Sequence, residues 1–318
     1  MISPFIKAAE VWLPSEDGQL LEFGSGTFGS ARRFASISKS MCFGRGEGLP
    51  GRAWDEGRPV LLNDLADPYF RRTAAAQADG LSCAVALPFF QRDKLTAVLV
   101  IFCSHGDGAT AAMELWHNNA HIATDMTLVA GAYGPQGAAF ESISHETSLP
   151  RGVGLPGQVW RRGEAIFMDD LGAKQYRFVR AEQVAAAGLK RGLAIPMESL
   201  RAADRHVLTF LVGARQPLAK RIERWVLNDA KTSLNCVYAY DEQIGAVVPT
   251  DEFSISLPLL SAGSITTALL RSVPTIDLNP AEGTGAPSAI ATLIEASALI
   301  TIPVVSDDEV VEAVVLYL

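Results

Sequence analysis

The sequence predicts an α+β fold in which a unit of about 105 residues occurs three times, each an antiparallel sheet with helices around it. Three observations lead to this prediction. A glycine-rich phrase occurs twice, as GEGLPGRAW at 46–54 and as GVGLPGQVW at 152–160. A Glu-x-Trp triplet occurs three times, beginning at Glu10, Glu114 and Glu223. Each unit also ends with two strongly apolar segments.

The opening segment of each unit is typical of a β-hairpin. In the first unit, AAEVWLP and QLLEFGSGTFG flank the turn SEDG, which contains the Asp and Gly that turns favour. The glycine phrase follows and leads into a short helix with Pro50 or Pro156 near its first turn. Short strands come next, within RPVLLNDL (58–65) and EAIFMDDL (164–171).

A second helix separates these strands from the end of the unit. In the first unit we expect Asp67 as its N-cap, Pro68 in its first turn and Gly80 at its end. In the second unit we expect it over 181–187, ending at Gly188. The closing strand pairs are CAVALPFF with LTAVLVIF, GLAIPM with HVLTFLVG, and ALITIPVV with EVVEAVVLYL, the last pair joined by SDDE at 306–309. Because these apolar runs are nearly continuous, we expect both faces of the sheet to be covered.

The separation between the tryptophans within each of units one and two locates the third unit in the sequence. The tryptophan of the glycine phrase follows the first tryptophan by 42 residues in unit one and by 44 in unit two. In unit three, 44 residues after Trp225 is Leu269, with Gly263 six residues before it. We therefore expect domains at 1–106, 107–216 and 217–318. The third is the most divergent because it lacks the Leu-Pro-Gly core of the phrase.

Composition limits the classes of partner. The chain has 318 residues, 48% of them hydrophobic and 19% charged, which favours folded domains over disorder. The net charge of −8 argues against nonspecific binding of nucleic acid or anionic membrane, since both need a basic surface. The N-terminus lacks a signal-peptide pattern, and no apolar run is long enough for a membrane helix. We therefore expect a cytoplasmic protein without nucleic-acid or membrane partners.

The order and spacing of these motifs resemble the GAF domain family. The residues that carry the resemblance are Gly46 to Gly57, Asp64-Leu65, Gly80-Leu81 and Leu87-Pro88, then Gly152 to Gly163, Asp170-Leu171, Gly188-Leu189 and Ile195-Pro196, and in unit three Asp277-Leu278 and Ile302-Pro303. The resemblance implies three GAF-like units, each an antiparallel sheet of five or six strands flanked by helices. It also implies a sensory or regulatory module that holds a small molecule between sheet and helix-loop cap, and that dimerises.

Three functions follow from the resemblance. The first is a non-enzymatic sensory or regulatory protein that binds a small ligand under the caps of units one and two, as a homodimer or with a partner signalling protein. The second is a protein-interaction scaffold whose pockets are filled by side chains. The third is a thiol-dependent reductase of the free methionine sulfoxide type, for which Cys83 lies near the relevant strand but no second thiol can be placed beside it. The sequence identifies no cofactor.

The candidate ligand-binding residues recur in both units. They are Asp64, Tyr69, Arg71, Arg72 and Cys83 in unit one, and Asp170, Tyr176, Arg177 and Arg180 in unit two. An aromatic ring beside arginines can hold a carboxylate or a phosphate by stacking and bidentate hydrogen bonds. The alternative is that these are solvated side chains at a helix start, with one buried ring.

Two other motifs carry no predicted chemistry. The glycine phrase is not a P-loop, because Arg52 or Gln158 follows its last glycine in place of lysine. We expect its glycines to allow close backbone approach, and its tryptophan to anchor the following helix. His117 and His121 have helical i, i+4 spacing, but we expect them in a turn after a strand, so we predict no metal site.

Overall fold

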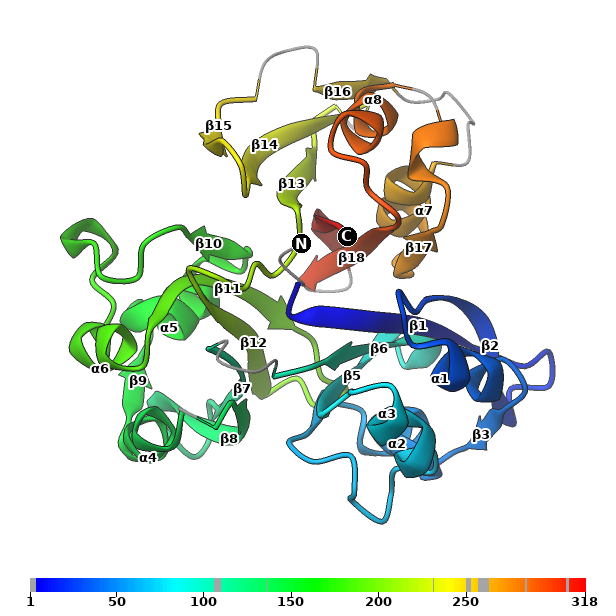
Figure 1. The fold of residues 1–318 in the computed structure, drawn as a ribbon, viewed down its shortest axis with the longest axis horizontal. Coiled ribbons are helices and arrows are strands. Elements are labelled where there is room, and N and C mark those ends of the chain that lie inside the picture. The colour runs from blue at the N-terminus through cyan, green and yellow to red at the C-terminus, as the bar shows by residue number, and fades with distance from the viewer. Residues whose placement is uncertain are drawn as a thin grey trace.

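The computed structural model describes residues 4–105, 110–135, 137–230, 232–249, 253–256, 263–283, 285–306 and 309–318. Figure 1 shows three lobes arranged around a common centre, each lobe made from one stretch of the chain. The strand orders are β3-β2-β1-β6-β5-β4, β10-β11-β12-β7-β8-β9 and β15-β14-β13-β19-β18-β17, and β16 also pairs with β14. Relative to its first strand, each unit repeats one strand order, so the predicted α+β repeat is confirmed. The third sheet has seven strands, one more than expected.

The first unit sets the pattern that the others repeat. Its elements are β1 (Ile6–Pro14), β2 (Leu20–Thr27), α1 (Arg32–Ser38), β3 (Cys42–Gly44), α2 (Gly48–Glu56), β4 (Val60–Leu62), α3 (Thr73–Ala78), β5 (Cys83–Gln91) and β6 (Lys94–Cys103). The central strand β1 pairs antiparallel with β2 on one side and with β6 on the other. The glycine phrase forms the start of α2, as predicted.

The second unit reproduces this order closely. Its elements are β7 (Ala111–Asn119), β8 (Asp125–Tyr133), α4 (Ala138–Glu146), β9 (Ser148–Pro150), α5 (Gly154–Arg162), β10 (Ile166–Met168), η1 (Lys174–Tyr176), α6 (Ala181–Ala186), β11 (Leu189–Met197) and β12 (Asp204–Gly213). Helix α6 lies where the sequence predicted it, and Gly188 follows with a φ of +71°.

The third unit keeps the plan with changed details. Its elements are β13 (Arg221–Leu227), β14 (Ser233–Asp241), β15 (Gly245–Val247), β16 (Ser254–Ser256), α7 (Ser264–Arg271), β17 (Thr275–Asp277), η2 (Pro280–Glu282), α8 (Ala286–Leu293), β18 (Leu299–Ser306) and β19 (Glu309–Tyr317). Gly263 is the N-cap of α7, so the spacing argument found the counterpart of α2 and α5 without the Leu-Pro-Gly letters. Residues 307 and 308 of the predicted SDDE turn lie outside the described residues.

One helix start was predicted wrongly. Asp67 does not cap α3, which begins at Thr73. Instead, the Asp67 carboxylate accepts the N–H of Tyr69 at 2.8 Å, and its carbonyl accepts the N–H of Phe70. The chain therefore makes a turn at Asp67, which places Phe70 in the core of the unit before the helix starts.

Each sheet is covered on both faces, as the continuous apolar runs predicted. In β5, Cys83 and Val85 face the centre of the molecule, while Ala84 and Ala86 face the helices of their own unit. The central face belongs to a cluster built by all three sheets, with members such as Leu193 and Ile300. One shared core therefore joins the units, and the alternation of strand side chains divides each sheet between this core and its own helices.

The units contact one another in a closed ring. Strand β4 of unit one packs on β8 of unit two, and β17 of unit three packs on β1 and β2 of unit one. Between units two and three, the rings of Phe167 and Tyr240 lie 4.7 Å apart. Each unit thus presents the same edge of its sheet to the next unit, which is how head-to-tail contacts close a ring.

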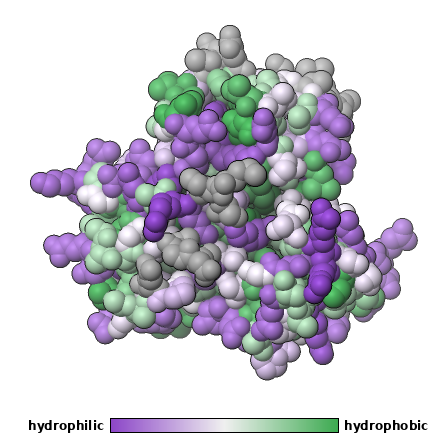
Figure 2. Space-filling model, in the orientation of Figure 1, coloured by the Kyte–Doolittle hydropathy of each residue, from purple (hydrophilic) through white to green (hydrophobic). Residues whose placement is uncertain are grey.

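The surface and the helices complete the description. Figure 2 shows that hydrophilic side chains cover most of the face seen in Figure 1, with apolar residues in small patches. Within the described ranges, no helix has the length and apolar character needed to cross a membrane.

Close backbone approach explains the repeated glycine phrase. A Cβ atom on Gly51 would lie 2.1 Å from the carbonyl oxygen of Gly44, and a Cβ atom on Gly157 would lie 2.4 Å from that of Pro150. The neighbouring atoms are backbone and cannot rotate away. Trp54 and Trp160 lie within the helices α2 and α5 themselves and are only half-buried.

Gly157→Ala is therefore expected to destabilise unit two by at least about 3 kcal/mol, because the added methyl group must move a strand away from a helix. Urea unfolding followed by circular dichroism measures this change. Gly172→Ala is the matched control, because its Cβ would meet only one side-chain oxygen of Asp170, at 3.4 Å, which is an ordinary van der Waals contact. Equal stability of the two variants would contradict this account of the phrase.

Candidate functional site

In unit one, the space beneath the cap holds a buried ion pair. Arg72, just before α3, is 3% exposed and donates to both oxygens of Glu10, at 2.6 and 3.0 Å. The same guanidinium donates to the Ser38 hydroxyl, and Trp12 Nε1 donates to Glu10 at 3.0 Å. We call Glu10, Trp12, Ser38 and Arg72 the cap cluster of unit one. Its carboxylate is satisfied by the protein itself.

Aromatic rings fill the rest of this space. The guanidinium carbon of Arg72 lies 4.4 Å from the ring centre of Phe34 and 5.4 to 5.6 Å from four further rings. These four rings belong to Trp12, Phe43, Phe70 and Phe102. Such contacts favour a desolvated cation. Beneath the cap of unit one there is therefore an arginine enclosed in aromatic side chains.

Unit two builds the same cluster from the equivalent residues. Arg180 is 2% exposed and donates to Glu114 at 2.6 and 2.9 Å. Trp116 Nε1 and the Ser144 and Tyr133 hydroxyls also donate to this carboxylate. Burial favours the neutral form of Glu114, but Arg180 and these hydrogen bonds outweigh it, so the pKa of Glu114 lies below its ordinary value.

Unit three keeps the carboxylate and the tryptophan but replaces the arginine. Glu223 accepts from Trp225 Nε1 at 2.8 Å and from the Tyr317 hydroxyl at 2.9 Å. Its cation is Arg221, two residues earlier on the same strand, whose Nε lies 2.6 Å from Glu223. The arginine has thus moved from the loop before the helix into β13, and the buried carboxylate is still paired.

The Glu-x-Trp triplet was the sequence signal for these clusters. As a sequence pattern it marks only the repeat. Glutamate and tryptophan two positions apart on a strand face the same side of the sheet. A carboxylate on a buried strand needs donors, so the triplet could have pointed to a buried arginine partner.

Most other candidate residues lie on the surface. Tyr69 is 51% exposed, and the guanidinium of Arg52 lies 4.8 Å from its ring centre. Arg71 and Arg177 are exposed, and the hydroxyl of Tyr176 donates to Asp169 at 2.6 Å. Tyr69 and Arg71 line a small open cavity of about 190 Å³ with Gly46, Gly48 and Pro68. Tyr69 and Arg71 thus lie at this open cavity, whereas the Arg72 side chain is buried.

The aspartates of the Asp-Leu motif shape a turn in all three units. Asp64 accepts the N–H of Ala66 at 2.8 Å, and Asp170 accepts that of Gly172 at 3.0 Å. Asp277 does the same for Asn279 at 2.9 Å. This arrangement is an Asx-turn, in which the carboxylate replaces a backbone acceptor.

Cys83 has a thiol partner that the sequence did not reveal. Cys103 lies directly opposite it, where β5 pairs with β6. Both side chains are fully buried in the central core. Burial, with the neighbouring Cys83, raises the pKa of Cys103 well above its ordinary value. A reactive cysteine needs the opposite conditions, access and a lowered pKa.

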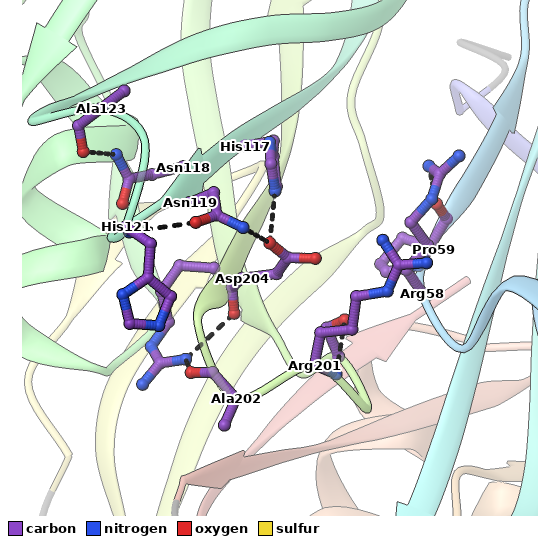
Figure 3. Close-up of polar contacts among 12 residues, drawn as sticks. Arg58, Pro59, His117, Asn118, Asn119, His121, Ala123, Arg201, Ala202 and Asp204 are labelled. Carbon is purple, nitrogen blue, oxygen red and sulfur yellow. Dashed lines mark hydrogen bonds and ion pairs between the residues drawn. The ribbon is translucent and has the colours of Figure 1, made fainter.

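His117 was expected in a turn but lies in β7. Its Nε2 is 3.1 Å from Asp204, and its ring centre is 4.7 Å from that of His206 on the neighbouring strand β12. Figure 3 shows His117 and Asn119 both pointing at the Asp204 carboxylate, with His121 outside this contact. The strand extends through Asn119, which was expected in the turn, because β12 pairs with it there.

A comparison with protein families gives a match for part of the chain. The GAF domain family matches residues 5–126, which include all of the first sheet. A comparison with curated proteins found no match.

Solved structures that resemble part of the chain include three bacterial proteins. The GAF domain of A. aeolicus NLH2 in an inactive state is 18% identical, with 32% of this chain and 60% of that chain covered and a TM-score of 0.26. The GAF domain of a phosphoenolpyruvate-protein phosphotransferase from Coxiella burnetii is 15% identical, with 31% and 56% covered and a TM-score of 0.26. Free methionine-R-sulfoxide reductase from Neisseria meningitidis is 16% identical, with 31% and 52% covered and a TM-score of 0.25.

This chain thus covers between 52% and 60% of the length of these three structures. The family match spans all six strands of the first sheet. Residues 5–126 therefore match the GAF domain family, and the second and third sheets repeat the strand order of the first sheet, which lies within that match.

Proposed function

We propose that this chain is a non-enzymatic regulatory protein, made of three GAF-type units at 1–106, 107–216 and 217–318, whose cap spaces are filled by its own side chains. The observation that carries the proposal is the Arg72–Glu10 pair beneath the first cap, repeated as Arg180–Glu114 beneath the second. In this reading the caps maintain the shape of the units. The protein acts in the cytoplasm as an interaction module, through a partner protein or a second copy.

Energetics support filled caps. A ligand beneath the first cap would have to displace Arg72 from a carboxylate that is fully buried. Separating a buried ion pair leaves an uncompensated charge, which costs about 3–5 kcal/mol. A ligand would have to repay that cost before gaining any affinity. The filled clusters therefore favour the scaffold hypothesis over a ligand-gated sensor at these positions.

A ligand panel tests the filled caps. Cyclic AMP, cyclic GMP, haem and biliverdin are added to the full chain, and melting temperature and native mass are measured. We expect no complex that depends on the caps. The shallow cavity beside Tyr69 and Arg71 is the competing site, so the double variant Tyr69→Ala/Arg71→Gln is measured in parallel. A ligand that binds the parent but not this variant would overturn the proposal.

The reductase hypothesis predicts that the protein reduces free methionine sulfoxide. The burial of its thiols argues against this activity. We expect no methionine to form when the full chain is incubated with free methionine-R-sulfoxide and dithiothreitol, because neither Cys83 nor Cys103 is accessible. Methionine is measured by chromatography. Cys83→Ser is the control variant, since its only difference is one sulfur atom. Turnover in the parent that is lost in this variant would restore the enzyme hypothesis.

A further inference from the structure

The ring of units forms a cavity that no single unit contains. The hairpins β5–β6, β11–β12 and β18–β19 contribute to one cavity of about 750 Å³. Phe90 lines it from unit one, Met197 from unit two and Val305 from unit three. We call this space the junction cavity. Small-molecule sites typically measure about 300–1,000 Å³ and often lie between domains.

The lining of the junction cavity is rich in arginine, although the chain is acidic. Its arginines are Arg92, Arg151, Arg161, Arg162 and Arg205, and its carboxylates are Asp93, Glu198 and Asp204. Among the described residues of the lining, five arginines against three carboxylates give a positive surplus in a chain of net charge −8. A local surplus of this kind attracts anions even when the whole protein does not.

The arginines are not used in ion pairs among the described residues. None of the five lies within 4.0 Å of a carboxylate of the described chain, whereas Asp204 is already engaged by His117 and Asn119. Arg205 donates to the backbone carbonyl of Ala202 at 2.6 Å, and Arg151 lies over the ring of Trp160 at 5.9 Å. Their guanidinium groups therefore retain capacity for an external anion.

A buried histidine adds an unpartnered polar atom to the same cavity. His206 lines it, is 2% exposed, and has no hydrogen-bond partner for Nδ1 among the described residues. Buried polar atoms without partners are rare in folded proteins. Burial, followed by the charges of His117 and Arg58, lowers the pKa of His206 to about 3, while Asp204 opposes this shift. The His206 ring is therefore neutral at physiological pH.

We propose that the junction cavity binds a compact small molecule that carries two or more phosphate groups. Guanidinium groups form paired hydrogen bonds with phosphate oxygens, and arginines on α5 and on the two hairpins can address separate phosphates. Neutral His206 supplies one further polar contact. Since the lining comes from all three units, the bound ligand holds the three units together. Its regulatory meaning rests on the proposed function, but the binding itself does not.

Inorganic pyrophosphate is the first probe, titrated into the full chain by calorimetry. Arg161→Gln/Arg162→Gln removes two adjacent arginines of α5 from the lining and should weaken binding at least tenfold, since hydrogen bonds between charged groups are strong. Arg32→Gln/Arg33→Gln is the matched control, because it removes two adjacent exposed arginines from α1, outside the lining. Undetectable binding at millimolar pyrophosphate, or equal weakening by both double variants, would overturn the proposal.

The NMR signals of the histidines provide a second test, in which binding is measured on the unmutated protein. On pyrophosphate addition to isotope-labelled protein, the His206 imidazole signal should shift, whereas His145 on α4, outside the lining, should not. His206→Phe serves to assign the signal. Citrate tests whether a small carboxylate ligand binds as well as a phosphate ligand. Single-stranded RNA tests whether the phosphates belong to a polymer. If either one displaced pyrophosphate more strongly than a small phosphate compound does, the proposed ligand class would be wrong. Failure here would leave the results of the cap ligand panel unchanged.

Discussion

Arg72→Met is expected to lower the free energy of unfolding by about 3–5 kcal/mol, because the buried Glu10 carboxylate loses its charged partner. Both side chains are almost fully excluded from water, at 1% and 0% exposure. Urea unfolding followed by circular dichroism measures the loss, and the contribution of Trp12 to the fluorescence reports on this region because its ring donates to the same carboxylate. Arg180→Met should behave similarly in unit two, where Glu114 would be left unpaired.

Two companion variants separate charge from packing. Arg71→Met changes the neighbouring arginine, whose side chain is 58% exposed, and should cost less than about 0.5 kcal/mol. Glu10→Met/Arg72→Met removes both charges and should recover part of the loss, although Trp12 Nε1 then lacks its acceptor and the Ser38 hydroxyl lacks the guanidinium donor. If Arg72→Met were as stable as Arg71→Met, the caps would not be held by the buried pair.

The protein is expected to lose stability as the pH falls from about 6.5 towards 3, by up to about 4 kcal/mol from His206 alone. An unfolded histidine binds a proton near pH 6.5, whereas folded His206 resists it until its pKa of about 3. The unfolded state therefore binds more protons in this window, and stability rises with pH. Urea unfolding at a series of pH values measures this slope.

His206→Phe should remove that part of the slope while retaining the ring that packs on His117. The comparison is cleanest above pH 4.5. Glu114 and Asp204 both have pKa values below their ordinary ones, so their contribution to stability is lost only at lower pH. An unchanged slope between pH 6.5 and 4.5 in His206→Phe would show that His206 is not the buried neutral group.

Recurrence made much of the fold predictable from sequence. The glycine phrase marked α2 and α5 correctly, because only glycine tolerates the approach of Gly44 to residue 51 and of Pro150 to residue 157. Spacing alone located α7, because a duplicated fold keeps the sequence separation between its elements when the residues themselves change. The start of α3 was wrong, because Asp67 can cap a turn as readily as a helix, and local sequence does not decide between them.

The arrangement of the candidate site, unlike the fold, could not be predicted from the sequence. Three neighbouring residues, Tyr69, Arg71 and Arg72, were predicted to act together, yet one is buried and two are exposed. Which arginine turns inward depends on Glu10, 62 residues earlier, and on the rings around it. No pattern within the loop contains that information. The same holds for Cys103, which strand pairing places opposite Cys83.

The sequence by itself determined that one α+β unit recurs three times and where most of its strands and helices lie, because periodicity, turn residues and glycine contacts act over short distances. Only the tertiary structure decided that the units close into a ring around one core. Only it decided that the caps are filled by arginine–glutamate pairs, and that the arginines of the junction cavity come together. Those outcomes depend on desolvation and charge pairing between residues far apart in the chain. These residues come into contact only when the sheets pack together.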